Sequence, residues 1–453
     1  MDQVPKEILI YILQSLPFDD LKRSLLVSKR FMDAGLEACL WKSFQLIVSK
    51  RNIGKLEKIL ELERMKNIKT VIFKGCKIKS KQLKLISQTK VKQIQIGDGH
   101  DIENDCIISE VTPSTLALLI GKMETFKFHN SLLAEMNPKQ IRCLANQLKE
   151  STSLKKLEIF YNNNLTSLPP EILASALCSL TELTLVFQKL NPDKYNAIFS
   201  QINQCSNLKV LNLPGNNLSN VNPEIFGTAV RKLEKVNLSD TRLTPAMFYM
   251  LLSKMKKDSE LQELDVSHNP SLKYIDDHIF SDAINTLEKV NLKFTNTTVS
   301  QLTHLFELMK LQTRLKDMNL VGNHSLANAS EILLAGTVNK LIKVTIYATK
   351  LSRSQIQAIL SHIEDKDSNL KALDLGGNNL SSIPSRLIAS SINKLENATL
   401  YCSQLSINQQ VEILLEALKD TKLKYLDLGG NQGRLPEELL KEVKKKIVLR
   451  LGP

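Results

Sequence analysis

The sequence predicts an α/β solenoid, a stack of strand–helix repeats, preceded by a small all-helical segment. Three observations lead to this fold class. The leucine pattern L-x-x-L-x-L, followed by a polar turn, recurs eleven times in register. A helical pattern of apolar residues follows the copies of that pattern, and residues 1–48 fit neither pattern. A solenoid grows by stacking repeats, so 453 residues need not divide into several globular domains.

The leucine pattern has a regular period. One copy reads Leu370, Leu373 and Leu375, followed by Gly-Gly-Asn-Asn-Leu. Successive copies start 25 to 29 residues apart, which is a repeat length typical of solenoids. Their first leucines are Leu154, Leu180, Leu208, Leu233, Leu261, Leu287, Leu315, Leu341, Leu370, Leu395 and Leu423.

Shorter and longer units alternate, and their turn residues alternate with them. The shorter units carry asparagine at the turn: Asn163 or a neighbour, Asn216, Asn269, Asn323, Asn378 and Asn431. The longer units carry Gln188, Thr241, Thr295, Thr349 and Ser403. An asparagine can hydrogen-bond the backbone where the chain leaves the strand, and threonine or serine can do part of this. The true repeat is therefore a pair of about 54 residues.

Helix signals follow each strand. Thr244 and Pro245 have the order of an N-cap and a first helical residue. Ser352 precedes Gln355 at capping-box spacing, as Ser406 precedes Gln409. Because helices are wider than strands, we expect a horseshoe with parallel strands on its concave face and helices on its convex face.

The pattern weakens before Leu154. Ile68, Val91 and Met123 begin irregularly spaced copies that we interpret as divergent repeats. The predicted organisation is therefore a helical domain over 1–48, a basic connecting segment with divergent repeats over 49–153, and regular repeats with a C-terminal cap over 154–453.

The regular repeats resemble the ribonuclease-inhibitor class of leucine-rich repeats, which also alternates two unit types of about these lengths. The resemblance implies a protein-binding scaffold. Ribonuclease inhibitors are very rich in cysteine, whereas this chain has seven scattered cysteines, which argues against that particular function.

Residues 1–48 predict three short helices. Apolar residues at amphipathic spacing indicate the first helix, and Pro17 ends it. A second helix is expected to start at Asp19 or Asp20, where an acidic side chain can cap it, and a third is expected from Ser28 toward Leu40. Three helices of this length bury little surface, so they need support from a neighbour or a partner. The apolar residues of this first helical pattern are Ile8, Leu9, Ile12, Leu13 and Leu16.

The order of these anchors resembles the F-box: a proline-led first helix, an Asp-Leu step, Val-Ser-Lys-Arg before Phe31, and a late Leu-Trp. Val4 stands where the family usually has leucine. The resemblance implies the substrate-recognition subunit of an SCF-type ubiquitin ligase, docking a Skp-type adaptor that bridges to a cullin complex. The docking residues it implies are Pro5, Ile8, Leu9, Ile12, Leu13, Leu16, Pro17, Leu21 and Val27. Each could instead belong to the helical core, and Trp41 is expected to be core.

The strand face of the repeats is the predicted site for a protein substrate, because exposed aromatic residues are frequent anchors of protein interfaces. Its candidate residues, expected at outward-pointing strand positions, are Phe160, Val186, Lys293, Tyr347, Tyr401 and Tyr425. The alternative is a stand-alone repeat scaffold or inhibitor that binds a protein without any ligase, which differs only in the role of residues 1–48.

Positive charge is concentrated in one segment. Lys50–Lys92 holds fourteen lysine or arginine residues against three acids, a net charge of +11 within a total of +13. Such a segment could meet nucleic-acid phosphates or an acidic membrane, or it could be a solvated face. Phe73 is its one aromatic residue, so base stacking is poorly supported and we do not expect a nucleic-acid partner.

Other sequence features concern chemistry and location. Nothing matches a Walker loop, GxSxG, HExxH or a Cys/His nucleophile pair, so we expect no enzyme, catalytic residue or cofactor. The lack of a CxxC or a Cys/His cluster argues against a metal site. No apolar run is long enough for a membrane span, and charges interrupt the N-terminus before a secretory h-region. Scattered cysteines indicate buried thiols in a reducing compartment, the cytoplasm or nucleus.

Overall fold

The computed structural model describes residues 4–14, 16, 20, 23–24, 26–37, 40, 44–62, 65, 67–97, 106, 110–129, 138–161, 164–177, 179–204, 207–255, 259–364, 368–419 and 421–452. The chain divides into two compact units, Met1–Asn216 and Asn217–Pro453. Both are built from the same alternation of a short strand and a helix.

The first unit begins with two helices that contact each other, α1 (Lys6–Gln14) and α3 (Lys29–Gly35). Its strands then pair in parallel, each with the next along the chain. The strands are β1 (Gln45–Ser49), β2 (Thr70–Lys74), β3 (Gln93–Ile96), β4 (Thr125–His129), β5 (Lys156–Phe160), β6 (Glu182–Val186) and β7 (Val210–Asn212). The helices between them are η2 (Ile53–Lys55), α4 (Leu56–Glu61), α5 (Ser80–Ser87), α6 (Pro113–Ile120), α7 (Pro138–Glu150), η5 (Asn164–Ser167), α8 (Pro170–Leu177) and α9 (Pro192–Gln204).

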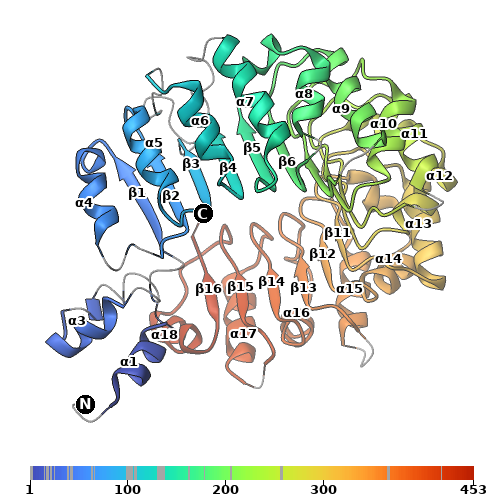
Figure 1. The fold of residues 1–453 in the computed structure, drawn as a ribbon. Helices are drawn as coiled ribbons and strands as arrows, with labels where there is room; N and C mark the ends of the chain where they lie inside the picture. Colours follow the sequence, from blue (N-terminus) through green and yellow to red (C-terminus); the bar gives the residue numbers. More distant parts are fainter. Residues whose placement is uncertain are drawn as a thin grey trace. The chain divides into compact units, whose positions relative to one another are not determined.

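The second unit continues the repeat, again with each strand parallel to the next. Within each unit the helices lie along one side of the strand layer (Figure 1). The strands are β8 (Lys235–Asn237), β9 (Glu263–Asp265), β10 (Lys289–Asn291), β11 (Asp317–Asn319), β12 (Lys343–Thr345), β13 (Ala372–Asp374), β14 (Asn397–Thr399), β15 (Tyr425–Asp427) and β16 (Val448–Arg450). The helices are α10 (Pro223–Val230), α11 (Pro245–Met255), η6 (Pro270–Tyr274), α12 (Asp277–Ile284), α13 (Val299–Leu311), η7 (His324–Asn328), α14 (Glu331–Val338), α15 (Arg353–Ile363), α16 (Ser385–Ile392), α17 (Ile407–Ala417) and α18 (Glu437–Lys446).

The predicted α/β solenoid with a helical N-terminal segment is confirmed. Strands β2, β3 and β4 begin just after Ile68, Val91 and Met123, so the divergent copies are repeats. Strand β1 begins at Gln45, inside the range assigned to the helical domain, because its apolar residues Leu46 and Val48 point into the repeat core. No helix in the described part of the chain is both long and apolar enough to cross a membrane.

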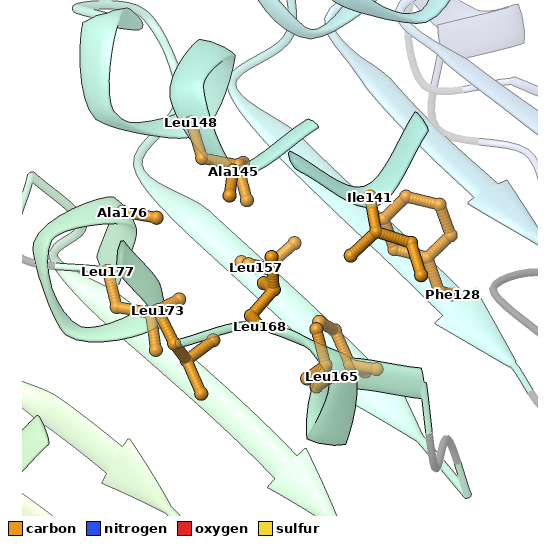
Figure 2. Close-up of a pocket in the computed structure, with 11 residues that line it drawn as sticks. Phe128, Ile141, Ala145, Leu148, Leu157, Leu165, Leu168, Leu173, Ala176 and Leu177 are labelled. Carbon is orange, nitrogen blue, oxygen red and sulfur yellow. The ribbon is translucent and has the colours of Figure 1, made fainter. Parts of the chain in front are cut away.

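Each repeat buries the apolar side chains that its pattern places between strand and helix. Around β5, Leu157 lies among Ile141 and Ala145 of α7 and Leu173 of α8, and the cavity they enclose is about 10 Å³ (Figure 2). A space of that size holds at most one water molecule and is lined by apolar groups, so it is core packing and no ligand site.

The turn asparagines hydrogen-bond the backbone where the chain leaves the strand, as the sequence predicts, and they also join neighbouring repeats. Asn163 lies outside the described residues. Asn378 is 2 % exposed, and its amide nitrogen donates to the carbonyl oxygens of Ile346 in the preceding unit and Leu375 in its own, at 2.8 and 3.0 Å. Its oxygen accepts the Leu351 N–H at 3.1 Å. Asn216, Asn269, Asn323 and Asn431 make the equivalent donations to the preceding unit.

Asn378→Ala should lower the free energy of unfolding by about 1–3 kcal/mol, because it leaves buried carbonyl and N–H groups without partners. Asn379→Ala is the matched control, because Asn379 is exposed and, in the described part of the chain, its hydrogen-bond partner is Ser381 of the same turn. That control should stay within about 0.5 kcal/mol of the wild type. Urea unfolding followed by circular dichroism measures both, and equal effects would contradict a special role for the buried asparagine.

The capping glutamines have a second role that sequence spacing does not reveal. The capping boxes at Ser352 with Gln355 and at Ser406 with Gln409 are present. Gln355 is also 2 % exposed, and its amide nitrogen donates to the carbonyls of Leu326 and Ala329 in the preceding unit at 2.9 and 2.8 Å. The helix start is thereby tied to the neighbouring repeat, and Gln301 and Gln409 do the same.

Candidate protein-binding surfaces

The first candidate surface lies on α1. Ser28 caps α3 by accepting the Phe31 N–H at 3.3 Å, which starts this helix where the sequence predicts. Helices α1 and α3 pack together, and Leu9 and Leu13 are 3 % and 1 % exposed. On another face of α1, Ile8, Tyr11 and Ile12 are 49 %, 76 % and 47 % exposed. These three residues form the apolar stripe of α1.

The structure divides the nine residues predicted to dock the adaptor. Pro5, Ile8, Ile12 and Val27 are exposed, and Leu16 is half-buried. Leu9 and Leu13 are core residues. Pro17 and Leu21 lie outside the described residues, as does Trp41. Tyr11 and Leu26 are exposed apolar residues that sequence reasoning missed, although the spacing of Tyr11 from Ile8 indicates a shared helical face.

The second candidate surface is the strand face of the second unit, formed by the residues on either side of each buried strand centre. Lys235, Val236 and Asn237 of β8 are exposed, buried and half-buried in turn, and β10, β12 and β14 repeat this pattern. In β9, β11 and β13 the first residue is half-buried as well. Alternate side chains of a strand point to opposite sides, so one central side chain enters the core and its two neighbours reach solvent.

Charges along β8 to β12 pair with one another across the strand face. Lys235 Nζ lies 2.6 Å from Glu263 Oε1, and Asp317 Oδ2 lies 3.8 Å from the Nζ atoms of both Lys289 and Lys343. At the same position, β13, β14 and β15 carry the uncharged Ala372, Asn397 and Tyr425. The row of charged residues that pair with one another therefore ends at β12.

Beyond that end lies an open hollow of about 420 Å³ over β12 to β15. Asp374 is among the residues that line this hollow. Burial raises the pKa of the Asp374 carboxyl, and the nearby Asp427 charge adds to this, while the Gly376 N–H and Lys343 oppose it. The lining residues are Lys343, Val344, Thr345, Ala372, Leu373, Asp374, Asn397, Thr399 and Tyr425.

The predicted substrate residues separate into three groups: strand-face residues, turn residues and one core residue. Phe160 ends β5 and Tyr425 begins β15, and both are half-buried as strand-face residues. Lys293, Tyr347 and Tyr401 are half-buried too, but they lie two residues beyond the ends of their strands, so their assignment to strand positions was wrong. The strands here are three residues long, which leaves these side chains in the following turn. Val186 ends β6 and is 9 % exposed, which makes it a core residue.

Sequence reasoning missed a set of exposed aromatic residues in the turns that follow the strands. Tyr161, Phe187 and Phe294 are 47 %, 44 % and 42 % exposed, and all three have positive φ. The Tyr161 and Phe187 rings stack with centroids 5.1 Å apart. Phe187 lies against Gly215 and Phe294 against Gly322, so the glycine of the next unit makes room for the ring. Glycine at the corresponding turn position was the signal available in the sequence.

Part of the basic segment is neutralised within the first unit. The two lysines beside Glu110 hold the pKa of its carboxyl below the usual value by hydrogen bonding. Pairing of this kind reduces the charge that a phosphate-bearing partner would meet. Ion pairs join Lys77 and Lys79 to Glu110, Lys81 to Glu57, and Lys92 to Glu124.

The described cysteines are thiols. Cys76 and Cys106 are buried with their Sγ atoms 4.0 Å apart, and Cys143 and Cys402 are half-buried. Within the described residues, no three His, Cys, Asp or Glu side chains group as ligands for a metal ion.

Comparisons with known proteins agree with this architecture. The F-box-like family model matches residues 1–46, and the Leucine Rich Repeat model matches residues 207–229 and 369–391. No curated protein sequence matches the chain significantly.

Two solved structures are similar at low identity. A leucine-rich-repeat protein of Leptospira interrogans is 15 % identical, with 89 % of this chain and 88 % of that one covered and a TM-score of 0.41. A chain of the yeast Rad7 and Elc1 complex is 16 % identical, with 79 % and 85 % covered and a TM-score of 0.44. F-box and leucine-rich-repeat domains are typically non-catalytic interaction modules. From its matched segments, the chain is an F-box and leucine-rich-repeat protein.

Proposed function

We propose that this protein is the substrate-recognition subunit of an SCF-type ubiquitin ligase. Its F-box-like segment would dock a Skp-type adaptor, and its repeats would bind a protein substrate. The protein would act in the cytoplasm, the nucleus or both, where the adaptor and cullin reside. On this proposal it contributes no catalytic residue of its own to ubiquitin transfer.

The apolar stripe of α1 carries the proposal. Ile8, Tyr11 and Ile12 expose large apolar side chains on one helical face, within the segment that matches the F-box-like family. Val27 is 65 % exposed and lies in the same segment. Contiguous exposed apolar residues are costly in water and mark binding sites for other proteins. Leu9 and Leu13 of the same helix are buried, so α1 has one apolar face in the core and another that is exposed.

Ile8→Asp combined with Ile12→Asp should weaken binding of a purified Skp-type adaptor by more than about 100-fold, because both charges enter an apolar interface centre. The helical content and the melting of the repeats should stay unchanged, because both side chains are exposed. Biolayer interferometry with the full chain measures the affinity, and circular dichroism measures the fold.

Glu7→Gln is the matched control for this experiment. Glu7 is exposed on the same helix and lies outside the apolar stripe, so its change should leave adaptor binding intact. If the wild-type chain fails to bind the adaptor, or if the double variant binds as the wild type does, the ligase proposal falls. A stand-alone repeat scaffold would then account for the chain.

A further inference from the structure

Two tyrosine–aspartate pairs recur one repeat pair apart in the second unit. The Tyr347 ring and the Asp374 carboxylate both lie within 3.1 Å of the point where a Cβ on Gly376 would stand. The Tyr401 ring and the Asp427 carboxylate have the same relation to Gly429. In each pair, the tyrosine comes from one repeat, and the aspartate and glycine come from the next repeat along the chain.

The turns do not need the negative charge of these aspartates. Asp374 Oδ1 accepts the Gly376 N–H at 2.9 Å, and Asp427 Oδ1 accepts the Gly429 N–H at 2.9 Å. In other units an asparagine does the same at the same strand position, as Asn237, Asn291 and Asn319 do at 2.9 to 3.1 Å. A neutral amide can therefore accept the hydrogen bond that the turn requires. The negative charge of the carboxylates on β13 and β15 is not needed for that bond.

Neighbouring cationic side chains neutralise these two carboxylates only in part. Asp374 Oδ2 has no hydrogen-bond partner among the described residues, and Lys343 Nζ lies 3.8 Å from Asp317 on the far side of β12. Asp427 Oδ2 has the Tyr425 hydroxyl at 3.4 Å and Arg450 Nε at 3.8 Å. Asp374 is thus the less compensated of the two, and it lines the hollow described above.

Aromatic rings beside these carboxylates favour a cationic ligand. The Tyr347 and Tyr401 ring centroids are 6.5 Å apart. An ammonium or guanidinium group near a tyrosine ring gains a cation–π attraction, and the half-buried Asp374 carboxylate adds a charge-assisted hydrogen bond. Asp427 is 5 % exposed and adds the attraction of its charge. An anionic group would be repelled by both carboxylates.

We propose that Tyr347, Tyr401, Asp374 and Asp427 bind lysine or arginine side chains of a basic segment in the partner protein. This inference deepens the proposed function, since it rests on the repeats binding a protein, and it specifies the chemistry of that protein. Of these four residues, Asp374 also lines the hollow over β12 to β15.

Two fluorescent peptides of equal length test this inference, one containing Gly-Arg-Gly-Arg-Gly and the other Gly-Gln-Gly-Gln-Gly. Fluorescence anisotropy with the full chain should show the arginine peptide binding at least about 10-fold more tightly than the glutamine peptide. Asp374→Asn with Asp427→Asn should remove that difference, because the amide keeps the turn hydrogen bond and loses the charge. Tyr347→Ala with Tyr401→Ala should weaken arginine-peptide binding as well.

Asp265→Asn is the matched control for general electrostatics. Asp265 occupies the same strand position and accepts the Ser267 N–H at 2.9 Å, with no tyrosine at the turn that precedes it. This control should leave arginine-peptide binding unchanged. Equal binding of both peptides, no binding of either, or equal losses from Asp265→Asn and the double asparagine variant would overturn the inference. Adaptor binding measured on the same variants tests the ligase proposal separately, because the adaptor surface lies on α1.

Discussion

Introducing aspartate at both Leu9 and Leu13 should unfold the helical N-terminal segment and abolish adaptor binding at the same time. These side chains are 3 % and 1 % exposed, and burying a carboxylate without a partner costs several kcal/mol, or forces its protonation. A pair of helices as short as α1 and α3 buries little surface and cannot absorb that cost. The repeats have their own core and should keep their melting transition.

Limited proteolysis checks this expectation. The Leu9→Asp and Leu13→Asp variant should be cleaved within residues 1–44 under conditions where the repeats and the wild-type segment resist. The Ile8→Asp and Ile12→Asp variant should lose the adaptor and keep its protease resistance. If both variants behave alike in proteolysis, the division of α1 into a core face and a docking face is wrong.

The sequence could not make that division. Leu9 and Leu13 share one side of α1, and Ile8 and Ile12 share an adjacent side, so the periodicity of apolar residues runs around more than half of the helix. Which part becomes core depends on the position of α3, and α3 is brought there by packing rather than by local spacing. Sequence reasoning therefore named both pairs as docking residues.

The repeat itself could be predicted well, because its causes are local. The leucine period sets which side chains enter the core, and the asparagine, serine and proline signals fix the turns and helix starts. The candidate site could be predicted only in part. Tyr347 and Tyr401 were identified, but their pairing with Asp374 and Asp427 joins residues of adjacent units, and the glycines that permit it read only as turn residues.

Gly322→Ala should destabilise the second unit by about 2–4 kcal/mol. Gly322 has a φ of +71°, a region that costs a residue with a Cβ about 1–2 kcal/mol. An added Cβ would also stand within 2.2 Å of the Phe294 ring carbons Cε1 and Cδ1. Overpacking of this kind costs about 1–3 kcal/mol, although Phe294 is 42 % exposed and its ring can turn toward solvent. The urea midpoint of the second unit measures the change.

Gly336→Ala provides a control of opposite sign. Gly336 lies within α14, and nothing stands within 4 Å of the position of its added Cβ. Alanine in a helix restricts the unfolded chain without strain, so this variant should gain about 0.4–1 kcal/mol. Destabilisation by both variants would mean that the distinction between the two glycines is unfounded.

Adding Phe294→Ala to Gly322→Ala separates the two causes of destabilisation. Removing the ring relieves the steric part of the cost and leaves the part that comes from φ, so the two changes should not be additive. The double variant should be more stable than the sum of the single effects predicts, by about 1 kcal/mol or more. Strict additivity would show that the ring does not press on this position, and that backbone conformation alone requires glycine there. A positive coupling would instead mean that Phe294 and Gly322 of the following repeat form one structural feature, in which the ring occupies the space that the missing Cβ leaves.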